Sequence, residues 1–360
     1  MTDLLDLLKD LSEAHGPTGF EGPVRDIMHR KLEPLSKKIS TDGLGSLIAQ
    51  LEPNPGAPTV MLSAHMDEVG MMVRFITEEG FIRFQTLGGW LDQALIGQRW
   101  QISTSEGIVN GITGIKTPHV MTSDERGRVF KKENLFIDVG AEDKADAEER
   151  LGIKPGDPIS PHSRFEKLNG SSILLGKAWD DRAGLAVMVG VMENAHTMKL
   201  PSNLVAVSTV QEEVGLRGAH TSSEIVKPDI GINLESGVAG DYPGISEYEA
   251  QEKLGWGPAI FLHDSSMLPN LKLRDLVKKT ADDLSIPLQY NVLSGYGEDG
   301  AEMQKSHGGS PVVNITVPTR YLHSHNSLID YNDVLKAIEL VTALVKTLDE
   351  ETVSKICKFD

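Results

Sequence analysis

The chain has 360 residues, 39% of them hydrophobic and 24% charged, with a formal net charge of −17 and one cysteine. This composition is typical of a folded protein of about two domains and excludes a largely disordered chain. The negative charge argues against nucleic acid or an anionic membrane surface as the main partner, because both bind basic faces. Since the lone Cys357 allows no internal disulfide, we expect a reducing compartment and a cytoplasmic protein.

The N-terminal segment predicts two helices and a strand. Residues 2–14 and 21–34 carry apolar residues at helical spacing, and the breaker "HGPTGFEG" lies between them. The run "TVMLSAH" (59–65) is typical of a short buried strand. The first helix lacks the basic start and the cleavage site of a signal peptide, and no apolar run reaches the roughly 18–20 residues of a membrane span. We therefore expect no association with a membrane.

Residues 71–164 differ in pattern from the segments on either side. Short β-like runs such as "MMVRFI", "RWQIST" and "GIVNGITGI" alternate with Gly, Pro and Asp turns, and one acidic helical patch (144–152) interrupts them. This pattern predicts a small β-rich domain inserted into a larger one. The larger, catalytic domain then consists of residues 1–70 and 165–360.

Apolar strands alternate with helices after the insert. Such alternation predicts an α/β fold in which a mainly parallel sheet is sandwiched by helices. The predicted strands are 203–210, 229–235 and 311–317, and the predicted helices are 181–196, 221–226, 271–284 and 331–349.

Side chains that can bind metal recur at the ends of these elements. Ligands of open α/β sheets bind beyond the carboxyl ends of the strands, so we expect these side chains to converge. Histidines and carboxylates without a thiolate suit zinc, cobalt or manganese, and a pair of such ions can activate water near neutral pH. The residues are His65, Asp67, Asp180, Glu212, Glu213, Glu235 and His323.

The neighbouring Glu212 and Glu213 offer two different roles. Adjacent strand residues point in opposite directions, so one carboxylate could bind metal while the other accepts a proton from water. The pattern alone leaves open which does which. Ordinary interpretations also exist, with Asp180 capping its helix and the glutamate pair facing solvent.

Competing chemistries find less support in the sequence. There is no G-x-S-x-G elbow for a serine hydrolase and no G-x-x-x-x-G-K-[ST] phosphate loop. A glycosidase with two carboxylates fits the many acids, but it leaves His65 and His323 without a role.

Four blocks of sequence resemble a known family. "AHMDEVG" (64–70), "KAWDDRAG" (177–184), "VQEEVGLRGA" (210–219) and "PTRYLHS" (318–324) are similar to the signature blocks of the tetrahedral (TET) di-metal aminopeptidases. That family includes the glutamyl aminopeptidases of lactic acid bacteria and members labelled cellulases or endoglucanases. The resemblance runs over nearly the whole chain in the expected order.

The resemblance implies two divalent ions per subunit, with zinc first and cobalt or manganese as alternatives. It makes Asp180 the bridge between the ions, Glu212 the general base and Asp67 the residue that orients a histidine ligand. The other implied ligands are His65, Glu213, Glu235 and His323. At position 235 the family usually has Asp, so the longer Glu235 is a departure.

A second departure lies in "SGYGEDGAEM" (294–303), where the family commonly reads like G-G-T-D-A-G. Asp299 keeps the acid, and with Arg320 it is a candidate for binding substrate. The resemblance also implies that the β-rich insert forms dimers, which assemble into a hollow dodecamer.

The leading hypothesis is therefore a metal-dependent aminopeptidase that acts on short peptides, with Glu212 moving the proton of the attacking water. A metal-dependent carboxypeptidase or amide deacylase is the first alternative, because related enzymes often carry Glu at the position of Glu235. A metal-bound scaffold without turnover is the second, because of the altered 294–303 loop.

Overall fold

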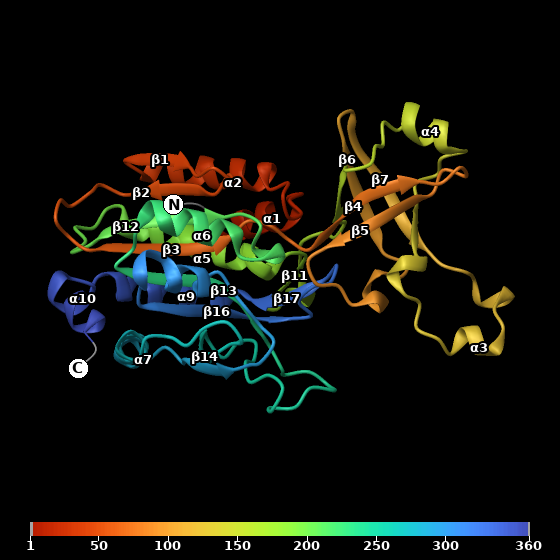
Figure 1. Ribbon diagram of the computed structural model, residues 1–360. Coiled ribbons are helices and arrows are strands. Elements are labelled where there is room, and N and C mark those ends of the chain that lie inside the picture. The colour runs from red at the N-terminus through yellow and green to blue at the C-terminus, as the bar shows by residue number, and fades with distance from the viewer. Residues whose placement is uncertain (1–2, 359–360) are drawn as a thin grey trace.

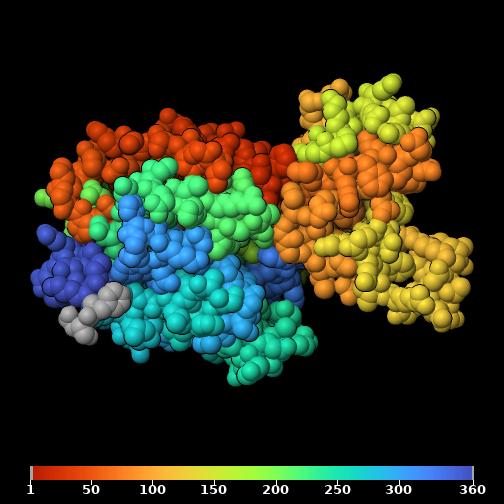
Figure 2. Space-filling model, in the orientation of Figure 1, coloured from red at the N-terminus to blue at the C-terminus, as the bar shows by residue number. Residues whose placement is uncertain are grey.

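The computed structural model describes residues 3–358. It consists of a large α/β body and a smaller β-rich body that projects from it (Figures 1 and 2). No helix within these residues is both long and apolar enough to cross a membrane.

The large body is built on one mixed sheet of 11 strands. Its central strands run parallel to one another in the order β12 (Asn203–Thr209), β3 (Thr59–His65), β13 (Ile230–Val238) and β16 (Val312–Arg320). These are the long apolar runs that the sequence predicts as strands. Both strand faces are buried, which is why the runs are continuously apolar rather than alternating.

The predicted mainly parallel sheet is wrong at its margins, where antiparallel strands extend the parallel centre. These flanking strands are only two to five residues long, too short for a periodic pattern to mark them in the sequence. On one side lie β2 (Leu47–Gln50) and β1 (Lys38–Thr41). On the other lie β17 (Ser327–Asp330), β11 (Ile173–Gly176) and β10 (Glu166–Lys167), and β14 (Ala259–His263) joins β16 and carries β15 (Gln289–Val292).

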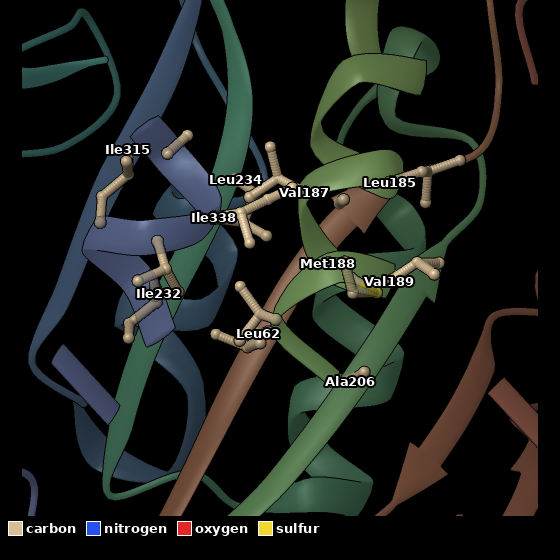
Figure 3. Close-up of a cluster of buried hydrophobic side chains, with 14 of the residues drawn as sticks. Leu62, Leu185, Val187, Met188, Val189, Ala206, Ile232, Leu234, Ile315 and Ile338 are labelled. Atoms are coloured by element: carbon tan, nitrogen blue, oxygen red, sulfur yellow. The ribbon is translucent and has the colours of Figure 1, made fainter. Parts of the chain in front are cut away.

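Helices cover both faces of the sheet. Alternate residues of β3 separate the faces, since Leu62 packs with α5 (Trp179–Ala195) and Met61 packs with α6 (Arg217–Val226). Figure 3 shows α5 against β3, β12 and β13, with Ile338 of the neighbouring helix α9 beside it. The other helices of the α5 side are α1 (Leu4–Glu13), α2 (Gly22–Leu32), α7 (Leu271–Leu284), α9 (Tyr331–Val345) and α10 (Glu350–Cys357), and α8 (Gly300–Lys305) lies beside α6.

The predicted closing helix 331–349 runs past the end of α9, and a further helix, α10, follows it. The α9 helix ends at Val345, and the Thr347 hydroxyl then donates to the carbonyl of Leu344. Asp349 caps the N-terminus of α10 by accepting from the amide of Thr352. A side-chain cap of this kind starts a new helix, so residues 346–349 connect α9 to α10, a helix that was not predicted from the sequence.

The β-rich body is a closed barrel with its own core. Trp100, Ile102 and Ile137 are among the side chains that fill it. Closing the sheet removes free edges, which suits a small unit of short strands. The strand order is β4 (Gly70–Ile76), β5 (Ile82–Leu87), β8 (Phe136–Asp138), β7 (Gly107–Gly114), β6 (Arg99–Thr104) and β9 (Pro158–Pro161), and the short helices α3 (Ser123–Arg126) and α4 (Lys144–Glu149) lie in its connections.

Candidate metal centre

The predicted ligands meet at the carboxyl end of the parallel strands. His65 is the last residue of β3, and Glu235 lies in the second half of β13. Asp180 stands at the start of α5, Glu213 follows β12 in a short 3-10 turn, and His323 follows β16. The structure thus brings together five side chains that are as much as 258 positions apart in the sequence.

These side chains form two groups that share Asp180. In the first, His65 Nε2 lies 2.9 Å from Asp180 Oδ1 and 3.5 Å from Glu235 Oε1. In the second, His323 Nε2 lies 3.3 Å from Asp180 Oδ2 and 3.4 Å from Glu213 Oε1. Each group offers ligand atoms that all lie within 4.8 Å of one another, as binding a metal ion requires. The two oxygens of Asp180 therefore face different groups, which is the geometry of a bridging carboxylate.

The histidine rings are held so that each Nε2 faces the carboxylates of its group. His65 donates its Nδ1 hydrogen to the carbonyl of Asp67 at 3.0 Å, and His323 donates to the carbonyl of Gly89 at 2.7 Å. A ligand histidine usually bonds through its other nitrogen in this way, which fixes the tautomer. Gly89 belongs to the "LGGW" segment that leads out of β5, so the β-rich body helps to orient the ring of His323.

The carboxylates of the cluster lack the partners that buried acids need. Glu213 Oε1 and Glu235 Oε2 are buried and accept no hydrogen bond from the described residues. Burial and neighbouring carboxylates raise the pKa of Glu213 to about 8, and they also raise the pKa of Glu235. Cations would relieve this unfavourable concentration of charge, so the donor set fits a pair of divalent metal ions.

Asp67 connects His65 to the short 3-10 turn that carries Glu212 and Glu213. Its Oδ1 accepts from the amide of Glu212 at 3.0 Å, and its Oδ2 accepts from the amide of Glu213 at 3.2 Å. The hydroxyl of Thr18 also donates to it, and the ring of His65 lies 3.5 Å away. Asp67 belongs to neither ligand group, so it positions the residues on both sides of it.

Glu212 lies in a cleft beside the two groups. The cleft has a volume of about 340 Å³, and its wall also includes Glu213, Glu235 and His323. Glu212 belongs to neither ligand group. Burial first, and then the charges of neighbouring carboxylates, raise the pKa of Glu212 well above its ordinary range. A carboxyl with a raised pKa that is not held by metal can accept and return a proton.

The two predicted substrate-binding residues lie away from the cleft wall. Arg320 makes a paired contact with Asp241, with nitrogen–oxygen distances of 2.7 and 2.6 Å. Asp299 is buried and accepts from the hydroxyl of Thr209 at the end of β12. Neither residue is among those that line the cleft, but the charges of His65 and Glu235 affect the pKa of Asp299, so Asp299 lies near the first group.

Sequence reasoning assigned no role to several residues that support the site. Asp181, which follows Asp180 through a cis peptide bond, accepts from the amides of His65 and Gly184. Glu21 accepts from the amide of Gln211, next to the glutamate pair. Only contacts between distant segments identify these residues, although Asp181 lies beside a predicted ligand.

The chain is similar to known peptidases over most of its length. The model of the family described as M42 glutamyl aminopeptidase matches residues 45–340, and a model described as AMPT matches residues 2–28. Glutamyl aminopeptidase of Lactococcus lactis is 33% identical and covers 98% of this chain and 99% of its own length. Lysyl aminopeptidase of Pyrococcus furiosus is 31% identical and covers 95% of this chain and 97% of its own.

Two solved structures share the whole architecture. A TET aminopeptidase from Thaumarchaeota archaeon SCGC AB-539-E09, of marine sediment, has a TM-score of 0.95, 40% identity and 98% coverage of both chains. The TET1 peptidase of Pyrococcus horikoshii, which can assemble into a tetrahedron or a large octahedral shell, has a TM-score of 0.87 and 30% identity. It covers 96% of this chain and 100% of that one. These similarities extend over both the sheet and the barrel.

Proposed function

We propose, from the premise that this chain belongs to the M42 glutamyl aminopeptidase family and is a peptidase, that it removes N-terminal residues from short peptides with the help of two divalent metal ions. The observation that carries the proposal is the pair of ligand groups sharing Asp180, with Glu212 free in the same cleft.

His65, Asp180 and Glu235 would hold one ion, and Asp180, Glu213 and His323 the other. Bound there, divalent ions would polarise the scissile carbonyl and make water more acidic, and zinc is our first choice with cobalt and manganese next. Asp67 holds His65 and the turn that carries Glu212 and Glu213 in fixed positions relative to each other.

Glu212 performs the proton transfers in this proposal. It accepts a proton as the water oxygen bonds to the carbonyl carbon, and it delivers that proton to the nitrogen when the C–N bond breaks. Its raised pKa supports this role, because a carboxyl that protonates easily can hold the proton between the two steps. The amide hydrogen bond to Asp67 fixes the backbone from which it acts.

The charge of the cleft favours a peptide with a free amino terminus. Carboxylates line the cleft, and no lysine or arginine does. The carboxylates of this wall that would not hold ions, such as Glu212, attract an ammonium group, and no described residue of the wall offers a lysine or arginine to a C-terminal carboxylate. This supports an aminopeptidase over the carboxypeptidase alternative, and Glu213 and Glu235 are the acids nearest to the predicted ions.

We further propose that the barrel forms dimers that build a dodecamer. The residues between β5 and β8 expose large apolar side chains, including Leu91 and Val120, which are 65% and 63% exposed. Exposed apolar side chains favour association, because an interface removes them from water. A closed assembly would admit only short peptides to the metal centre. We keep the cytoplasm as its compartment, a placement that the single cysteine supports.

The test is hydrolysis by protein that has been stripped of metal and reloaded with zinc, cobalt or manganese. We expect cleavage of aminoacyl anilides and free-amine peptides, and none of their N-acetylated counterparts. Cleavage of N-blocked substrates alone would contradict the proposal and favour a carboxypeptidase or deacylase. Two bound ions without turnover on any substrate would favour the scaffold alternative.

A further inference from the structure

Glu298 is a buried acid in the cleft wall that the proposed chemistry does not use. It stands in the 294–303 segment, directly after Tyr296 and Gly297, which line the same cleft. Only 1% of its surface is exposed, and both carboxylate oxygens lack a hydrogen-bond partner among the described residues. It also belongs to neither of the two ligand groups.

The backbone around Glu298 is held in place by its neighbours. The Tyr296 hydroxyl donates to the carbonyl of Ser236, one residue after the ligand Glu235, at 3.0 Å. Asp299, on the other side, accepts from Thr209. Because both flanking residues are bonded to strands of the sheet, the Glu298 carboxylate stays at the cleft wall.

None of the described residues that line the cleft is a lysine or arginine that could balance Glu298. The charged residues of the wall are acids and one histidine, and Asp264, an acid outside the wall whose charge affects Glu298, accepts from amides of its own loop and from Asn314. Arg320 is paired with Asp241. Burial first, and then Glu235 and Asp264, raise the pKa of Glu298 well above its ordinary range. An anion in this place is costly until a cation arrives.

We propose that Glu298 binds the side-chain ammonium or guanidinium of the substrate's N-terminal residue, so that the enzyme prefers peptides beginning with Lys or Arg. This inference rests on the proposed function and names its substrate class. An acidic N-terminal side chain finds no lysine or arginine in the cleft wall and meets several carboxylates.

The side-chain cation of the substrate's N-terminal residue is a better partner for Glu298 than the α-ammonium group of that residue. The α-ammonium is joined to the carbon next to the scissile carbonyl, so it must lie beside the ions, where Glu213 and Glu235 stand. Glu298 stands on a separate segment and belongs to neither ligand group, so it is not one of the acids that would hold the ions. A long flexible side chain can reach across such a separation.

The test compares kcat/KM for the p-nitroanilides of lysine, arginine, norleucine and glutamate in metal-loaded protein. Norleucine keeps the alkyl chain of lysine and lacks its ammonium. We expect lysine and arginine to exceed norleucine by roughly 10- to 100-fold, the usual effect of a buried charge-assisted hydrogen bond. Glutamate should be the poorest substrate.

Glu298→Gln separates this role from a structural one. We expect it to lose the preference for lysine while its rate on norleucine stays within about threefold of wild type. Its melting temperature should not fall, because a neutral amide replaces an unpaired acid. Glu302→Gln is the matched control, since Glu302 in the same segment bonds Lys305 and His220 outside the cleft, and it should change neither rate.

Three results would overturn the inference. A similar loss on all substrates would place Glu298 at the α-ammonium, a preference for glutamate would contradict the charge argument, and a third bound ion that Glu298→Gln removes would make it a metal ligand. Calorimetric measurement of the binding of free L-lysine and L-norleucine distinguishes a failure of the Glu298 proposal from a failure of the proposed function. Tighter binding of lysine without any hydrolysis would preserve the Glu298 subsite and reject the aminopeptidase.

Discussion

Two buried clusters of charge flank the start of α5, and they are satisfied in different ways. In the first, Glu68 receives Lys177 Nζ at 2.5 and 2.7 Å and the amide of Gly16 at 3.2 Å, with Arg182 Nη2 3.6 Å away. In the second, the acids around Asp180 face two histidines and one another, and several of their oxygens have no partner.

The difference separates structure from function in residues that look alike in the sequence. The Glu68 cluster supplies its own cations, so it needs nothing from outside and joins α1, β3 and α5 into one unit. The acids of the metal centre are left for a ligand to complete. Buried acids without partners are costly, so their persistence indicates a cation that arrives from solution.

Glu212→Gln is expected to have the largest effect on activity. Glu212 belongs to the cluster whose acids lack partners, but it would not itself bind a metal ion. We predict that kcat falls by about 10²–10⁴-fold, the usual loss for a general base. Metal content should stay at two ions per chain, as measured by elemental analysis. A rate near that of wild type with both ions bound would show that another group moves the proton.

Glu68→Gln breaks the satisfied cluster and is expected to have the largest effect on stability. It leaves the buried Lys177 without its carboxylate partner, which typically costs about 3–5 kcal/mol. Urea unfolding followed by circular dichroism measures the loss. As a control, Glu125→Gln breaks the exposed pair with Lys116 and should leave the midpoint unchanged. Equal effects from the two variants would contradict the distinction between the clusters.

Glu252 adds a third case to the comparison, because it is a buried acid whose hydrogen-bond partners are all neutral. Burial raises the pKa of Glu252 to about 8, although hydrogen bonds from Asn291 and Thr316 act in the opposite direction. Between its ordinary value of 4.5 and 8, the folded state keeps a proton that the unfolded chain has lost, so stability falls as the pH rises through this window.

Glu252→Gln should therefore stabilise the protein at pH 8.5 by about 2–3 kcal/mol and have little effect at pH 4.5. Thermal unfolding at the two pH values measures this difference. The exposed Glu247 provides a control variant, Glu247→Gln, whose effect should not depend on pH. An equal effect of Glu252→Gln at both pH values would mean that Glu252 is ionised in the folded protein throughout.

The sequence predicts the place of the metal centre because that place follows from chain order. Ends of parallel strands meet at one edge of a sheet, so His65, Glu213, Glu235 and His323 could be grouped before any coordinates. Their individual roles came from the resemblance and not from the spacing. The antiparallel margins were missed because β1, β2 and β17 have only 4 residues each, too few for a periodic pattern to mark them in the sequence.

Partners that come from distant segments could not be predicted. Arg320 was a candidate for binding substrate, but it pairs with Asp241, 79 residues earlier, and this contact has no local pattern. Glu298 was part of a divergent loop, and only its burial without a partner separates it from the solvated acids nearby. Sequence reveals which side chains can do chemistry, whereas the folded structure reveals which of them remain unpaired.

The central claim is that Asp180 is shared by two metal ions, and metal content tests it most directly. Elemental analysis of zinc-reloaded protein should give two ions per chain for the wild type, and His323→Ala should remove one of them. Asp180→Ala should remove both or nearly both, since it belongs to each group. If Asp180→Ala retained two ions, or if the wild type bound fewer than two at saturation, the shared centre would be contradicted.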